Sequence, residues 1–304
     1  MFISVHVYIY LFMTQRLSMF KFFSKKKTLG RVGLLFNHSH IRLVSDDATP
    51  IFHSHPAISP QEWGAALSEL FLRHPIAHRQ INITLAAGFY QQVQIDKPVV
   101  TEDEMAGAIA WAVKDFVTEP IHQLVMDYVD LPVPTQGQDR VSVTLVPRAR
   151  IQSLVDAISP HAAIERITTE EFALARLFPL DDVTRVLLWQ PTGSDLQLLV
   201  FRQRSVCFSR SLRGFKHLSS SALSPEELDT LALEVQRSLA YLQGQLKLPE
   251  CGAMQVAISS PVLGDLVRHL EQAFSFTVSA MANPAILTGI DYLPAYAVLQ
   301  ERAE

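Results

Sequence analysis

Apolar residues along the chain fall into short runs with strand character and longer stretches with helical spacing. The clearest example lies between residues 183 and 246. Three apolar runs there, bounded by turn residues, predict an antiparallel meander over residues 186–189, 196–201 and 206–212. Ser224-Pro225-Glu226-Glu227 is typical of a helix start, and leucine or valine recurs at helical spacing as far as Leu246. A long helix is therefore expected to follow the meander.

The same alternation fills the rest of the chain. Residues 32–36 and 41–44 predict two strands joined by the turn Asn37-His38-Ser39-His40, in which asparagine would tolerate a positive φ. Further strands are expected at residues 51–53, 81–85, 90–95, 124–129, 141–146, 164–167, 255–258 and 276–278. Helices are expected at residues 59–74, 101–117, 151–159, 170–178, 262–274 and 292–299. Hairpins alternating with helices in both halves predict a bilobed α/β or α+β protein, divided at Pro179-Leu180-Asp181-Asp182.

The first residues form an apolar leader with an ambiguous role. Residues 1–13 are almost wholly apolar, but the run is shorter than the roughly twenty residues of a membrane span. No Lys or Arg precedes it and no small-residue cleavage site follows, so it is not a typical signal peptide. We interpret residues 1–28 as a disordered or mis-called leader, with the true start near Met19. A membrane-touching segment is the alternative, because residues 19–27 mix aromatic residues with lysines.

Composition excludes several classes of function. The net charge of −4 argues against nucleic acid as the main partner, which would require a basic face. Cys207 and Cys251 are the only cysteines and form no Cys-x-x-Cys pair, so we expect free thiols rather than a disulfide framework or a structural zinc site. The chain has no P-loop, no Gly-x-Ser-x-Gly and no His-Glu-x-x-His, so hydrolase chemistry of those kinds has no support.

The order of elements resembles that of the actin-like ATPase superfamily, and several stretches resemble its PilM-like family. Residues 231–241 are similar to a PilM helix that carries a Glu, an Arg-Ser-Leu and an aromatic residue. Residues 116–128 resemble a PilM segment in which Pro-Ile is followed by Asp-Tyr. Residues 170–176 resemble the helix that closes the first PilM lobe, and residues 208–214 resemble the hairpin of the second. Within this family the chain is most similar to the MshI type, which serves the mannose-sensitive haemagglutinin (MSHA) pilus.

The resemblance implies a bilobed actin-like (ribonuclease H-like) ATPase fold of the PilM type. The first lobe would span residues 29–180, with an inserted small subdomain at about 60–135. The second lobe would span residues 181–304, with its C-terminal helix returning to the first. The resemblance also implies a cytoplasmic protein peripheral to the inner membrane of a Gram-negative bacterium. Its expected partner is the cytoplasmic tail of a PilN-like inner-membrane protein, and the assembly ATPase of the pilus is a further candidate.

The nucleotide-binding positions of the family can be compared with this chain one by one. PilM-type sequences carry Gly-x-Asp-x-Gly-Ser in the first hairpin, with a Lys beyond it. Here Gly33 is present, but Leu35 stands in place of the Asp and Asn37 in place of the second Gly, with Arg42 beyond. Leucine cannot hold a metal-bound water, and a carboxylate beside Mg²⁺ contributes several kcal/mol to such a site.

The other two nucleotide positions also depart from the family pattern. The second hairpin should carry Asp-x-Gly, but this chain has Gln190-Pro191-Thr192-Gly193, and Asp195 would substitute only in a shifted loop. The adenosine contact should be a Gly pair, but Ser259-Ser260-Pro261 follows the strand, and these side chains keep a nucleotide from lying close. We therefore expect a pseudo-ATPase without a cofactor. The degenerate pocket positions are Gly33, Asn37, Thr192, Gly193, Ser259 and Ser260. Binding of ATP with Mg²⁺ remains the alternative.

Two further groups of residues, histidines and arginines, suggest a function. His38-Ser39-His40 and His53-Ser54-His55 place histidines on alternate residues, which would share one face of a strand and could chelate a metal. No nearby Cys or acid completes the set, so we expect exposed turn and edge residues instead. The arginines of the second-lobe hairpin would be a solvated turn, or a contact for an acidic partner or membrane surface. They are Arg202, Arg204, Arg210 and Arg213.

Overall fold

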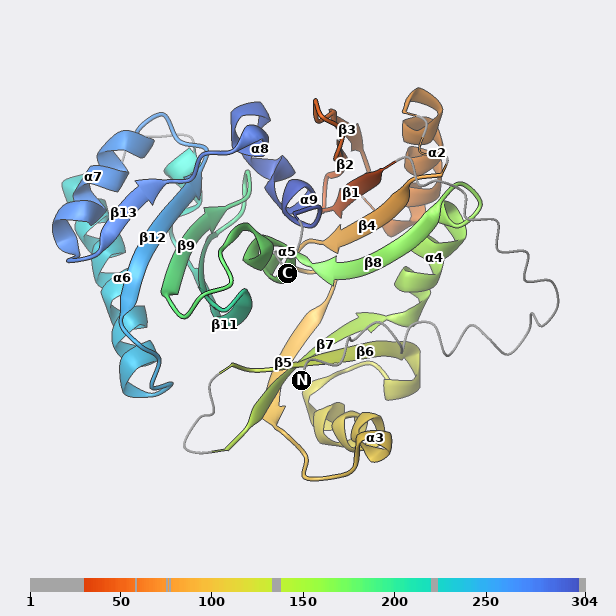
Figure 1. The fold of residues 1–304 in the computed structure, drawn as a ribbon, viewed down its shortest axis with the longest axis horizontal. Helices are drawn as coiled ribbons and strands as arrows, with labels where there is room; N and C mark the ends of the chain where they lie inside the picture. The colour runs from red at the N-terminus through yellow and green to blue at the C-terminus, as the bar shows by residue number, and fades with distance from the viewer. Residues whose placement is uncertain are drawn as a thin grey trace.

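A computed structural model describes residues 30–57, 59–74, 76, 78–132, 138–219 and 224–300. It contains two five-stranded sheets and one three-stranded sheet, and the two large sheets lie in separate lobes (Figure 1). The leader interpretation concerns residues 1–28, which lie outside the described residues. Within the described part of the chain, no helix is long and apolar enough to cross a membrane.

The first large sheet combines a hairpin with parallel strands. Its strand order is β3-β2-β1-β4-β8; β1, β2 and β3 pair antiparallel, and β4 and β8 extend the sheet in parallel. These strands are β1 (Arg31–Phe36), β2 (His40–Ser45), β3 (Phe52–Pro56), β4 (Gln80–Leu85) and β8 (Ala163–Thr169). The helices α2 (Trp63–Arg73) and α4 (Arg148–Ile158) pack together on its outer side (Figure 1).

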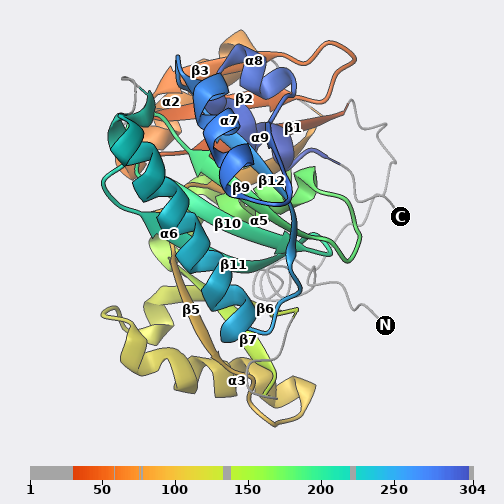
Figure 2. The same ribbon diagram turned by 90° about the vertical axis from the view of Figure 1, so that its left-hand side faces the viewer.

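The second large sheet repeats this arrangement. Its strand order is β11-β10-β9-β12-β13, again an antiparallel meander extended by parallel strands, so the meander predicted from the sequence is confirmed. The strands are β9 (Thr184–Gln190), β10 (Leu196–Arg202), β11 (Ser205–Leu212), β12 (Cys251–Ile258) and β13 (Thr277–Ala280). The helices α6 (Pro225–Gly244) and α7 (Leu263–Ala273) cover its outer face (Figure 2).

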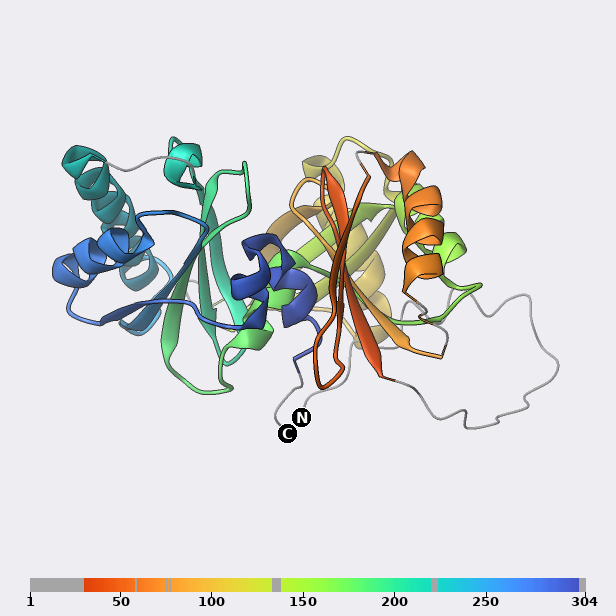
Figure 3. The same cartoon turned by 90° about the horizontal axis from the view of Figure 1, so that it is seen from above.

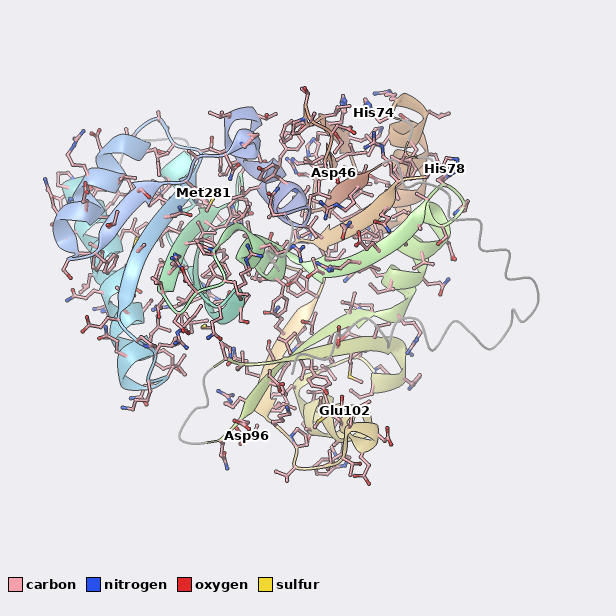
Figure 4. The ribbon with its side chains drawn as sticks, in the orientation of Figure 1. Asp46, His74, His78, Asp96, Glu102 and Met281 are labelled. Carbon is pink, nitrogen blue, oxygen red and sulfur yellow. The ribbon has the colours of Figure 1, made fainter. Side chains whose placement is uncertain are left out.

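The small subdomain starts later than the expected position near residue 60. It consists of β5 (Gln91–Asp96), α3 (Glu102–Val113), β6 (Leu124–Asp130) and β7 (Arg140–Pro147), in strand order β5-β7-β6. It has an apolar core of its own, and Asp96 and Glu102 lie at its end, away from the large sheets (Figure 4). The difference arises because α2 packs into the core of the first lobe and β4 pairs with β1, so both belong to that lobe.

A single apolar core joins the two lobes. It includes Leu34 from the first sheet, Trp189 and Phe201 from the second, and Leu293 from α9 (Leu293–Ala297). The helices α5 (Glu170–Leu174) and α9 lie between the two large sheets, and α9 contacts β1, β2 and β4 (Figure 3). Phe178 stacks on Phe201 across this junction, with ring centroids 4.7 Å apart. The short elements between the lobes are η5 (Ala175–Leu177), α8 (Pro284–Thr288) and η7 (Ile290–Tyr292).

The helix start predicted at Ser224 is confirmed, and the structure adds a capping box to it. Ser224 Oγ accepts the Glu227 amide at 3.2 Å, and Glu227 Oε2 accepts the Ser224 amide at 2.8 Å. The helix expected to begin at Ser59 starts differently, because Ser59 makes no side-chain cap and a 3-10 turn, η2 (Pro60–Glu62), comes before α2. The remaining described 3-10 turns are η3 (Lys114–Phe116), η4 (Ile121–Gln123) and η6 (Lys216–Ser219).

Substituting these two serines should have unequal effects. Ser224→Ala leaves the Glu227 amide without its side-chain acceptor, so we expect a loss of about 1 kcal/mol in the free energy of unfolding. Ser59→Ala is the matched control and should change it by less than about 0.5 kcal/mol. Urea denaturation of both variants measures the difference, and equal effects would show that the capping box does not stabilise α6.

Candidate functional site

Most of the nucleotide-pocket positions singled out in the sequence lie at the carboxyl ends of strands in the two large sheets. Ligands of open α/β sheets bind outside these strand ends. Gln190 pairs with Ile258, so the turn after β9 and the residues after β12 leave the second sheet side by side. The structure thus brings Thr192, Gly193, Ser259 and Ser260 to one edge. Asn37 follows β1 at the corresponding edge of the first sheet, whereas Gly33 lies inside β1.

Asn37 closes the first hairpin through its side chain. Its Oδ1 accepts the amides of Ser39 at 3.0 Å and His40 at 2.8 Å, and the Ser39 hydroxyl at 3.2 Å. Asn37 does not adopt the positive φ that asparagine would tolerate in this turn. A side-chain oxygen that caps the turn removes the need for that conformation. The amides of Ser39 and His40 are therefore satisfied within the turn and are not left for an external anion.

Gly33 and Leu35 serve packing. A Cβ on Gly33 would lie 2.0 Å from the carbonyl oxygen of Ala295 and 3.1 Å from a methyl of Val298. Glycine at this position thus lets α9 approach the middle of β1. Leu35, at the position where the family carries a carboxylate, is 3% exposed and belongs to the core that joins the lobes. Neither residue is available to a phosphate or a metal.

A neutral amide fixes the turn of the second hairpin. The buried Gln190 donates from Nε2 to the carbonyls of Ser194 at 3.1 Å and Phe215 at 2.8 Å. Gly193 adopts φ +73° at the tip of this turn, a conformation that glycine accepts readily. The pairing of β9 with β10 has no register shift, so the shifted loop that would let Asp195 replace the missing carboxylate is not formed.

The residues at the adenosine position, Ser259 and Ser260, lie in the turn before α7. Ser260 Oγ accepts the amide of Val262 at 3.3 Å, and the Ser260 carbonyl accepts the amide of Leu263 at 3.3 Å. Ser259 is exposed and Ser260 is half-buried. The residues after β12 thus form a turn closed by Ser260, and α7 begins after it without a side-chain cap.

The sequence did not point to Asp291, which links the two lobes. Its Oδ1 accepts the amide of Thr192 at 2.8 Å, and its Oδ2 accepts Arg42 Nη2 at 2.9 Å. The side chains of Arg42 and Asp291 are only 10% and 16% exposed. Arg42 lies on β2 and Thr192 follows β9, so one carboxylate joins the hairpins of the two lobes.

Two adjacent glutamates are buried at the end of β8. Glu170 and Glu171 are 5% and 8% exposed. Glu170 Oε1 accepts the amide of Ala87 at 3.2 Å, and the Tyr90 hydroxyl donates to Glu171. Burial, helped by the charge of Glu171, raises the pKa of Glu170 to about 8. An acid pair directly after a strand is a signal by which the sequence could have marked this position.

The raised pKa of Glu170 predicts a pH-dependent stability. The pKa in the folded protein lies above the ordinary value of 4.5, so the folded state holds a proton that the unfolded state releases. This contribution is fully present below pH 4.5 and is lost as the pH rises through about 8. Glu170→Gln keeps the acceptor for Ala87 and removes the titration.

We therefore expect Glu170→Gln to be more stable than the wild type at pH 8.5 and equally stable near pH 4.5. Thermal unfolding across this pH range measures the difference. Glu271→Gln, on the exposed side of α7, is the control and should follow the wild type. A Glu170→Gln curve parallel to that of the wild type would contradict the prediction.

The four histidines singled out in the sequence have partners within the chain, as do Arg202, Arg204 and Arg210, whereas Arg213 is exposed. His53 stacks on His74 with ring centroids 3.3 Å apart, and His55 contacts Glu69 at 3.0 Å. Among the described residues, no group of three or more His, Cys, Asp or Glu side chains is arranged to hold a metal ion. Arg202 pairs with Asp182, and Arg210 with Glu234, each at 2.8 Å. These two arginines are therefore neutralised within the chain.

Comparison with known proteins identifies the fold. No family model matches the chain, and no curated protein matches it. The solved structure of a PilM-PilN type IV pilus biogenesis complex aligns over 90% of this chain and 98% of that one, with a TM-score of 0.66 and 18% identity. A Bacteroides thetaiotaomicron protein with an actin-like ATPase fold aligns over 93% and 100%, with a TM-score of 0.54 and 12% identity. This chain has the actin-like ATPase fold.

A third solved structure has the same fold. The cytoplasmic domain of EpsL, an inner-membrane component of the type II secretion system of Vibrio cholerae, aligns over 89% of this chain and 95% of that one. The TM-score is 0.52 and the identity 12%. At these identities the comparisons establish the fold, and the function has to be argued from the residues.

A magnesium nucleotide does not fit the residues that the fold places at its hairpins. The carboxylate position of the first hairpin is the buried Leu35, and that of the second is a Gln190 committed to two backbone carbonyls. The Ser39 and His40 amides of the first turn are satisfied by Asn37, and the Thr192 amide of the second by Asp291. We derive no catalytic step through a nucleotide.

Proposed function

We propose that this chain is a non-catalytic cytoplasmic scaffold of type IV pilus biogenesis, of the MshI type that serves the MSHA pilus. It binds the cytoplasmic tail of a PilN-like inner-membrane protein and is held at the inner membrane of a Gram-negative bacterium through that partner. The observation that carries the proposal is the alignment over 98% of the PilM chain of a PilM-PilN complex, combined with hairpins whose donors are used internally.

The way in which the chain holds its two lobes together supports a scaffold. The apolar core that spans both lobes holds the sheets together through contacts of the chain itself. A protein stabilised in this way presents a fixed surface to a peptide without a bound nucleotide. An extended tail would bind through main-chain pairing or apolar anchor residues.

A binding assay tests the scaffold directly. The purified chain is titrated into a fluorescent peptide with the N-terminal sequence of a PilN-like protein from the same genome, and anisotropy is recorded. We expect saturable binding to this peptide and none to a scrambled peptide of the same composition. Equal signals from the two peptides would contradict the proposal. A PilN-like reading frame next to this gene would support the pilus assignment. Neighbouring genes of the MSHA pilus would support the MSHA role.

A working nucleotide-binding ATPase of the same assembly machinery is the second candidate. It is favoured by one observation, the turn at Gly193, which keeps a positive φ and has open space where a Cβ would stand. Calorimetry with Mg-ATP separates the candidates. Micromolar affinity that is lost in Gly193→Val would support the ATPase, and the absence of binding supports the scaffold.

A further inference from the structure

Donors from both lobes converge on the carboxylate of Asp291. The Thr192 amide approaches one oxygen and Arg42 Nη2 approaches the other, at 2.8 and 2.9 Å. The second guanidinium nitrogen of Arg42, Nη1, is buried and has no hydrogen-bond partner among the described residues. Arg42 as a whole is 8% exposed. The arginine therefore has more donor capacity than the carboxylate uses.

These donors form a set suited to an oxyanion. A guanidinium presents a planar fork that matches two oxygens of a carboxylate or phosphate, and a turn amide adds a directed N–H group. Thr192 is exposed, so one side of this set of donors faces solvent, whereas the Arg42 side is buried. An anion from solution could reach both donors if the internal carboxylate were withdrawn.

A well-packed segment delivers the internal carboxylate. Asp291 lies in η7, between the buried Ile290 and Tyr292. The Tyr292 ring meets Phe52 edge-on with centroids 5.5 Å apart, and the Arg42 guanidinium lies 5.8 Å from the centre of the same ring. The carboxylate is therefore held in place before any partner or ligand arrives.

We propose that Asp291 is an intramolecular ligand occupying an oxyanion site made by Arg42 and the Thr192 amide. Its carboxylate competes with external anions of the phosphate class, so the site is latent in the wild type. The inference rests on the proposed function, a scaffold without a nucleotide, because the Asp291 carboxylate then joins the two hairpins in place of a bound phosphate. Removing the carboxylate opens the site to inorganic phosphate.

Inorganic phosphate is the probe for this site. Thermal unfolding of Asp291→Ala, Asp265→Ala and the wild type is followed in phosphate and in chloride of equal ionic strength. Asp265 pairs with Arg268 on the exposed face of α7, so its variant controls for loss of a surface carboxylate. We expect phosphate to raise the midpoint of Asp291→Ala by several degrees more than that of the other two proteins. An equal phosphate response in all three would overturn the proposal.

Two further variants keep the test decisive. If Asp291→Ala does not fold, Asp291→Asn keeps the side-chain volume without the charge and should show a smaller phosphate response of the same sign. The absence of any added response in Asp291→Asn would then overturn the proposal. The double variant with Asp291→Ala and Arg42→Gln should lose the response, and its persistence would place the anion elsewhere. Mg-ATP binding by the wild type would contradict the proposed function without changing these outcomes.

Discussion

Asp291→Ala is expected to lower the free energy of unfolding by about 3 kcal/mol in chloride buffer. The change removes the partner of a guanidinium that is only 10% exposed, and an uncompensated buried charge costs about 3–5 kcal/mol. It also leaves the Thr192 amide without its acceptor. Urea denaturation measures the loss, with Asp265→Ala as the control at less than about 1 kcal/mol. A loss no larger than that of the control would show that the link between the lobes contributes little.

Gly33→Ala should have an effect of similar size for a different reason. The added methyl would stand 2.0 Å from the Ala295 carbonyl oxygen, and that oxygen belongs to the backbone of α9 and cannot rotate away. We expect a loss of about 3 kcal/mol, at or above the upper end of ordinary overpacking, or a failure to fold. Thermal or urea unfolding of the purified variant measures this loss.

A second glycine provides a matched control. Gly107 lies on an exposed face of α3 with nothing within 4 Å of its would-be Cβ. Gly107→Ala should raise stability by about 0.5–1 kcal/mol. If Gly33→Ala folds as stably as Gly107→Ala, Gly33 is not needed for packing, and a role in close approach to a ligand becomes the better explanation.

The local patterns of the sequence predicted most elements because each pattern is contained in a few residues. The long helix was expected from Ser224 to Leu246 and spans α6 (Pro225–Gly244), since its capping box and leucine spacing are local. The subdomain boundary was not predictable in the same way. Whether β4 joins the first sheet or the small one depends on its pairing with β1, about fifty residues earlier, and the strand pattern alone does not state this. The short helix α8 (Pro284–Thr288) gave too brief a pattern to be predicted.

The sequence shows which residues occupy the nucleotide positions, but it does not show the contacts that those positions make in the folded chain. Leu35 and Gln190 stand at positions where the PilM-type pattern has a carboxylate, and this can be seen in the sequence. The contact of Arg42 with Asp291 joins residues 249 positions apart, and an isolated acid in an apolar tail carries no mark of its partner. The role of Asn37 was also hidden, because the same residue favours both a left-handed turn and a side-chain cap.

The most direct test of the account measures the affinity of the PilN-like tail peptide for the wild-type chain, with and without Mg-ATP. The nucleotide positions of both hairpins are engaged in internal contacts, so binding should not depend on nucleotide. We expect the same dissociation constant in both buffers. Binding only in Mg-ATP, or a dissociation constant changed tenfold by it, would contradict a scaffold that works without a nucleotide.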